Sequence, residues 1–101
     1  MIKINIIKKD NLIDNISIKG HALYDESGKD IVCSSVSSIV ITTVNAIIRF
    51  QKDAIIYDEN DGYLKIEILK HNDIVDLLID NMINLLEELE DQYKKYIKIN
   101  K

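Results

Sequence analysis

Hydrophobic and polar residues alternate in two runs near the start of the chain. In residues 1–8 isoleucine occupies every second position from Ile2 to Ile6, and a period of two is typical of a half-buried strand. Residues 12–19 resume the alternation, and the intervening Lys-Asp-Asn of residues 9–11 is typical of a turn. The pattern therefore predicts a β-hairpin.

The spacing becomes helical from Asp30 onwards. Branched hydrophobic residues recur every three or four positions, at Val32, Val36, Val40 (or Ile39), Val44 (or Thr43) and Ile47. β-Branched residues favour strands intrinsically. A segment of about five helical turns would nevertheless be an unusually long strand. We therefore expect a helix that begins after Asp30 as its N-cap.

Two short strands and a second helix follow. Residues 54–57 and 63–69 read as strands around a turn at 58–62. Residues 74–93 are predicted to form an amphipathic helix capped by Asn72 or Asp73. Its expected apolar stripe is Val75, Leu78, Ile79, Met82, Leu85, Leu86 and Leu89.

The tail of the chain alternates once more, in residues 97–99, which we expect to form a short edge strand. The order strand, strand, helix, strand, strand, helix, strand predicts an α+β fold. Its expected form has two layers, with a mainly antiparallel sheet of four to five strands packed on two helices. At 101 residues the chain is expected to be a single domain, 1–101.

Charge and composition argue against several classes of protein. The net charge is -4 and the only arginine is Arg49, which argues against a basic nucleic-acid-binding surface. A single cysteine excludes an internal disulfide and is typical of a reducing compartment. The most apolar stretch, from Ile39 to Ile48, is too short to span a bilayer. We expect a cytoplasmic protein with neither a membrane nor a direct nucleic-acid partner.

Reactive residue types gather in residues 20–33, GHALYDESGKDIVC. With Asp30 as N-cap, Cys33 would lie in the first helical turn, where unpaired N–H groups and the macrodipole favour a thiolate. Gly20 and Gly28 would let the loop return His21 toward this helix start. A cysteine–histidine pair is one arrangement that activates a thiol nucleophile.

Each of these residues also has a structural interpretation. A lone cysteine in an apolar helix is usually a small core residue, and a lone histidine in a loop is usually a surface residue. Asp30 is most simply a helix cap. Ser37 lies one turn after Cys33 and would suit a close helix contact equally well. His71 has no partner in sequence, and no spacing of cysteine and histidine suggests a metal site.

Residues in this segment and further along the first helix closely resemble the signature of the ribosomal-processing cysteine protease family, Prp. They are Gly20-His21-Ala22, Gly28, Asp30-Ile31-Val32-Cys33, Ser37 and Val44-Asn45-Ala46-Ile47. The resemblance covers nearly the whole chain. It implies a catalytic dyad of Cys33 and His21, with Asp30 and Ser37 in supporting positions, no cofactor, and a homodimer.

The resemblance also implies a substrate. The family removes a short N-terminal extension from a large-subunit ribosomal protein, number twenty-seven, and cuts after an apolar-aromatic stretch. Leu23 and Tyr24 are the apolar residues of the loop, and we expect them to contact that stretch. The alternative is a non-catalytic, ribosome-associated binding module.

Overall fold

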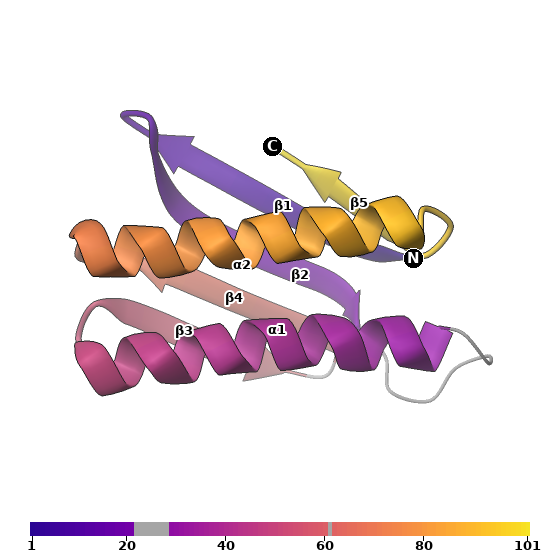
Figure 1. Ribbon diagram of the computed structural model, residues 1–101, viewed down its shortest axis with the longest axis horizontal. Helices are drawn as coiled ribbons and strands as arrows, with labels where there is room; N and C mark the ends of the chain where they lie inside the picture. The colour runs from indigo at the N-terminus through magenta and orange to yellow at the C-terminus, as the bar shows by residue number, and fades with distance from the viewer. Residues whose placement is uncertain (22–28, 61) are drawn as a thin grey trace.

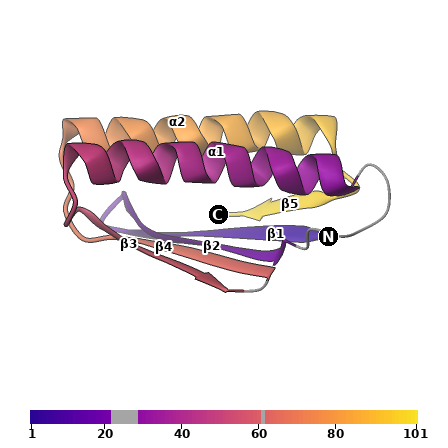
Figure 2. The same ribbon diagram turned by 90° about the horizontal axis from the view of Figure 1, so that it is seen from below.

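The computed structural model describes residues 1–21, 29–60 and 62–101. They form two layers, a sheet covered on one face by two helices (Figure 1; Figure 2). The elements in chain order are β1 (Ile2–Lys9), β2 (Leu12–His21), α1 (Lys29–Phe50), β3 (Ile55–Asn60), β4 (Gly62–Ile68), α2 (Asp73–Gln92) and β5 (Ile97–Asn100). The predicted α+β class, two-layer form and element order are confirmed.

The sheet has five strands in the order β3-β4-β2-β1-β5. The β1–β2, β2–β4 and β3–β4 pairs are antiparallel, whereas β5 pairs with β1 in parallel. The predicted edge strand at the end of the chain is therefore confirmed. A parallel neighbour requires a long connection, and everything between β1 and β5 in the chain, including both helices, supplies it.

The core lies between the sheet and the helices. Alternate residues of β1, β2 and β4 face it, including Ile2, Ile4, Ile16, Ile18, Leu64 and Ile66, each no more than 1% exposed. The helix α1 contributes Val32, Cys33, Val36, Val40, Val44 and Ile47. The predicted helical spacing of this segment is confirmed, because the residues that recur every three or four positions are the buried ones.

Two predicted boundaries were wrong. The Asp10 and Asn11 turn matches the expectation, with φ of 53° and 64°, and β2 continues past the alternating residues 12–19 to end at His21. The strand β3 continues through residues 58–60, which we expected in the turn, because Asp58 lies opposite Lys65 on β4. Cross-strand pairs of opposite charge favour this extension.

The second boundary is the start of α1. This helix begins at Lys29, so Asp30 is its second residue and does not occupy the predicted N-cap position. The predicted cap of α2 is confirmed at Asn72, whose side chain accepts a hydrogen bond from the Val75 backbone N–H at 3.0 Å. On the same helix, the predicted stripe omitted Ile83, which is buried, and wrongly included Leu85, which is 39% exposed.

The helix α1 is also longer and more apolar than the sequence pattern suggested. Its segment Ile31–Phe50 has a mean hydropathy of 2.0 over a length sufficient to cross a membrane. The expectation that no segment reaches that length was therefore wrong. In this fold the helix instead covers the sheet and contributes its buried valines to the core.

Candidate active site

The backbone of His21 occupies a defined place in the sheet. It is the last residue of β2 and lies opposite Gly62 of β4, after a register shift between Lys19 and His21. Such a shift marks a β-bulge, which bends a strand and changes the direction of the residues that follow. The sequence pattern predicted a turn at Gly62 and gave no sign of its pairing with His21.

Gly20 forms this bulge in a conformation that favours glycine. Its φ is +81°, in the region that side chains with a Cβ rarely adopt. A Cβ built on Gly20 would overlap the carbonyl oxygen of Met1 and lie 3.3 Å from the Met1 carbonyl carbon. The start of the chain therefore lies directly against the residue before His21.

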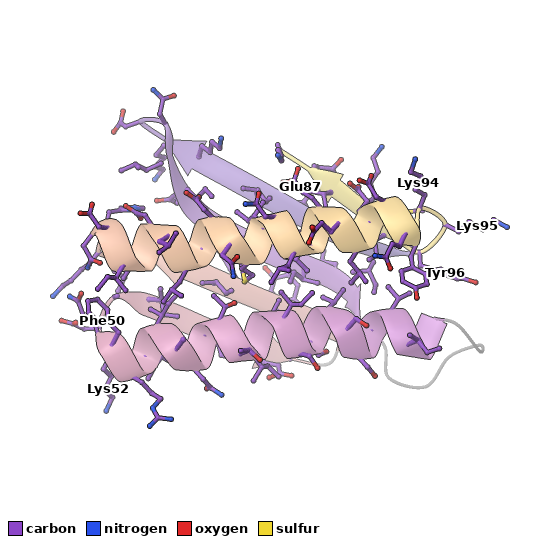
Figure 3. All side chains as sticks on the ribbon, in the orientation of Figure 1. Phe50, Lys52, Glu87, Lys94, Lys95 and Tyr96 are labelled. Carbon is purple, nitrogen blue, oxygen red and sulfur yellow. The ribbon has the colours of Figure 1, made fainter. Side chains whose placement is uncertain are left out.

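Tyr96 fixes the start of the chain from the other side. The Ile2 backbone N–H donates to the Tyr96 carbonyl oxygen at 2.7 Å, and Figure 3 shows Tyr96 beyond the end of α2 at the same end of the molecule as the start of α1. Backbone contacts thus connect the α2–β5 link, the N-terminal residues and Gly20. Nothing in the local sequence pattern signals this connection.

Cys33 lies deeper in α1 than expected. It is the fifth residue of the helix, in the second turn, because the helix begins at Lys29. Its backbone N–H is thus beyond the four that lack an intrahelical acceptor, and the macrodipole weakens within the first turn. Asp30, as the second residue of the helix, lies in that first turn.

The Cys33 side chain is 0% exposed, between Val32 and Val36 in the core cluster. Cys33 is therefore packed as a small core residue, which confirms the structural interpretation of this side chain. Ser37 follows one turn later and is partly buried. Cys33 and Ser37 both take part in interactions with other residues.

The structure brings the predicted dyad to the same end of the molecule. Figures 1 and 2 both show the end of β2 and the start of α1 at the end of the layers where the chain also begins. The candidate substrate contacts Leu23 and Tyr24 lie outside the described residues. His71 is remote in the chain, in the link before α2, and its Nδ1 lies 2.8 Å from Asp76 Oδ1, a partner that the sequence pattern does not indicate.

Comparisons with known proteins agree on one family. Residues 1–98 match the family model described as cysteine protease Prp. The chain is 32% identical over 104 residues to the ribosomal processing cysteine protease Prp of Staphylococcus aureus (strain Mu50), covering 99% of this chain and 98% of that protein.

Two solved structures of the S. aureus protease Prp have the same fold. One, in complex with a substrate peptide, aligns with a TM-score of 0.90 at 28% identity over 99% of this chain and 98% of that chain. The other, in complex with a covalently linked product peptide, aligns with a TM-score of 0.82 at 32% identity and the same coverage. The comparisons thus favour an enzyme over a non-catalytic binding module. The chain belongs to the cysteine protease Prp family and is a cysteine protease.

Proposed function

We propose that Cys33 is the nucleophile of this protease and that His21 is its general base and acid. The single observation that carries the proposal is that Cys33 is the only cysteine in the chain, so a cysteine protease built from this chain has no other thiol. His21 is supported by its place at the end of β2, at the same end of the molecule as the start of α1. The other histidine, His71, is paired with Asp76 at 2.8 Å.

The reaction proceeds in two steps. His21 accepts the thiol proton as Cys33 Sγ adds to the scissile carbonyl carbon, and the proton then passes to the departing amine as the C–N bond breaks. This leaves a thioester. Water, deprotonated by His21, adds to the thioester carbonyl, and the C–S bond breaks to release the carboxylic acid and the thiol. The covalently linked product peptide of the S. aureus relative supports such an intermediate.

The proposed substrate is the N-terminally extended large-subunit ribosomal protein, number twenty-seven, that the sequence resemblance implies. Support comes from the relatives' description as ribosomal processing proteases and from the substrate peptide bound by one of them. A homodimer and a cytoplasmic location stay predictions. Sedimentation of the purified protein tests the first, and fractionation of cells tests the second.

Incubation of the purified chain with the extended ribosomal protein, followed by mass spectrometry, tests the proposal. Wild type should release the extension, and Cys33→Ala should release none while still unfolding in a single cooperative urea transition, at a somewhat lower urea concentration because a buried sulfur is removed. Ser38→Ala, an exposed change on the same helix, should cleave normally. A folded Cys33→Ala protein with undiminished cleavage would overturn the assignment of the nucleophile. Failure of wild type on this substrate, with cleavage of another ribosomal protein, would overturn only the substrate.

A further inference from the structure

The two halves of β1 have different neighbours on the outer side of the sheet. Residues Ile2 to Asn5 pair with Ile97 to Asn100 of β5, and residues 6–9 have no strand beside them on that side among the described residues. Figure 1 shows β5 ending part of the way along β1. Backbone N–H and C=O groups that face an open sheet edge are available to pair with another strand.

A groove lies between α2 and the residues of β1, β2 and β4 beneath it, and it reaches the open edge at Ile6 and Lys8. It consists of two adjoining cavities of about 260 and 240 Å³, which share Lys8, Ile13 and Asp80 as lining residues. Its floor is apolar, because Ile6, Ile79 and Ile83 line it and are buried. The groove therefore combines open backbone with an apolar floor.

The α2 side of the groove is acidic. Asp76, Asp80 and Glu87 line it, and Lys8 and Lys101 line the groove as well, so three carboxylates stand against two lysines. Figure 3 shows Glu87 on the side of α2 toward β5. Glu87 pairs with Lys101 at 2.8 Å and Asp76 pairs with His71 at 2.8 Å. Asp80 is exposed and has no ion pair within the described part of the chain, so its charge is available to a cation in the groove.

We propose that this groove is a second binding site for the substrate, which takes an extended segment containing lysine or arginine. The segment adds as a strand along residues 6–9 of β1, and its basic side chains meet Asp80. Strand addition gives affinity through main-chain hydrogen bonds and specificity through alternate side chains. The proposal rests on the proposed function, because a ribosomal protein needs lysine and arginine to contact RNA phosphates. The net charge of -4 favours the same partner.

Hydrogen exchange on the Cys33→Ala protein tests where the segment binds. The probe is a short lysine- and arginine-containing peptide from the mature part of the precursor, and its control has glutamine at each basic position. The basic peptide should protect amides of residues 6–9, and the control should protect them much less. Equal protection by both peptides, or none by either, would overturn the proposal. Protection in the free protein that disappears on dilution would assign the edge to a second copy and also overturn it.

Kinetics with a charge reversal test whether the site acts on the substrate. Asp80→Lys should lower kcat/KM on the full-length precursor about tenfold, since an attraction becomes a repulsion. It should change kcat/KM less than about twofold on a peptide that spans only the cleavage site. Glu88→Lys makes the same charge change on an exposed residue of α2 outside both cavities, and it should affect both substrates alike. Equal losses for Asp80→Lys on both substrates would contradict the proposal. If wild type cleaves neither substrate, the proposed function fails, and the exchange experiment still reports on the groove.

Discussion

Gly20 of β2 lies against the backbone carbonyl of Met1, with no room for a Cβ between them. This contact joins the first residue of the chain to the residue that precedes His21. It also places two demands on one position, a φ of +81° and the absence of a side chain. The two demands are separable by substitution, because asparagine tolerates the positive φ better than alanine does.

Gly20→Asn should therefore destabilise the protein although its backbone preference is suitable. We expect a loss of about 1–3 kcal/mol in the free energy of unfolding, the range for inserting extra atoms into a packed site, measured by urea denaturation. Gly62→Asn is the control, since Gly62 has a similar φ of +69°. If both variants lose the same stability, the Met1 contact contributes nothing. Cleavage by the folded Gly20→Asn protein should also fall, because Met1 and β2 must separate next to His21.

His21→Ala should reduce kcat about 10²–10⁴-fold, the usual contribution of a general base or acid. Precursor cleavage measured at saturating substrate tests this. His71→Ala is the matched control, because it removes the other histidine and only its contact with Asp76. A loss below about tenfold for His21→Ala would assign this residue a structural role.

Two variants of Asp30 distinguish a helix-capping role of this residue from a role of its charge. As the second residue of α1, its carboxylate is expected to stabilise the helix through the macrodipole. Asp30→Asn should then lose about 0.3–1 kcal/mol of unfolding free energy, and Asp30→Ala a similar amount. If Asp30 were the N-cap, alanine would cost about 0.5–2 kcal/mol and asparagine would restore stability. Urea denaturation of the two variants distinguishes these results.

Asn72 caps α2 and also joins it to the end of α1. Its side-chain oxygen accepts from Val75 N–H at 3.0 Å, and its amide donates to Gln51 Oε1 at 2.9 Å. Asn72→Ala should lower the unfolding free energy by about 0.5–2 kcal/mol. Asn72→Asp keeps the cap acceptor and loses the donor, so it should retain most of the stability. Equal losses in the two variants would show that the bond to Gln51 matters more than the cap.

Tyr57 should make the protein less stable at high pH. Burial, followed by the hydrogen bond at 3.0 Å to Glu59 and the charge of that carboxylate, raises the pKa of Tyr57 to about 12 from 10.0. Between these values the unfolded tyrosine loses its proton while the folded one keeps it, so stability falls as pH rises. Tyr57→Phe lacks this contribution. Urea midpoints at about pH 9 and about pH 11 should show a smaller decline for Tyr57→Phe than for wild type; parallel declines would contradict the assignment.

The elements and the candidate chemistry could be predicted from the sequence, because both depend on patterns among residues close together in the chain. The alternation around Ile4 and the helical spacing from Val32 to Ile47 depend on neighbours a few residues apart. The same holds for the Asn72 cap, which was predicted as one of two alternatives. His21 and Cys33 were identified from the rarity of their residue types and from the motif around them.

The way in which these parts meet depends on tertiary contacts. The parallel pairing of β5 with β1, the His21–Gly62 register and the Met1–Gly20 contact join residues far apart in the chain. Local periodicity carries no information about such pairs. The start of α1 at Lys29 moved Cys33 from the predicted first turn to the second, since a helix boundary reflects end contacts as well as local preference. The open edge along residues 6–9 of β1 is likewise a tertiary feature, because β5 pairs only with Ile2 to Asn5.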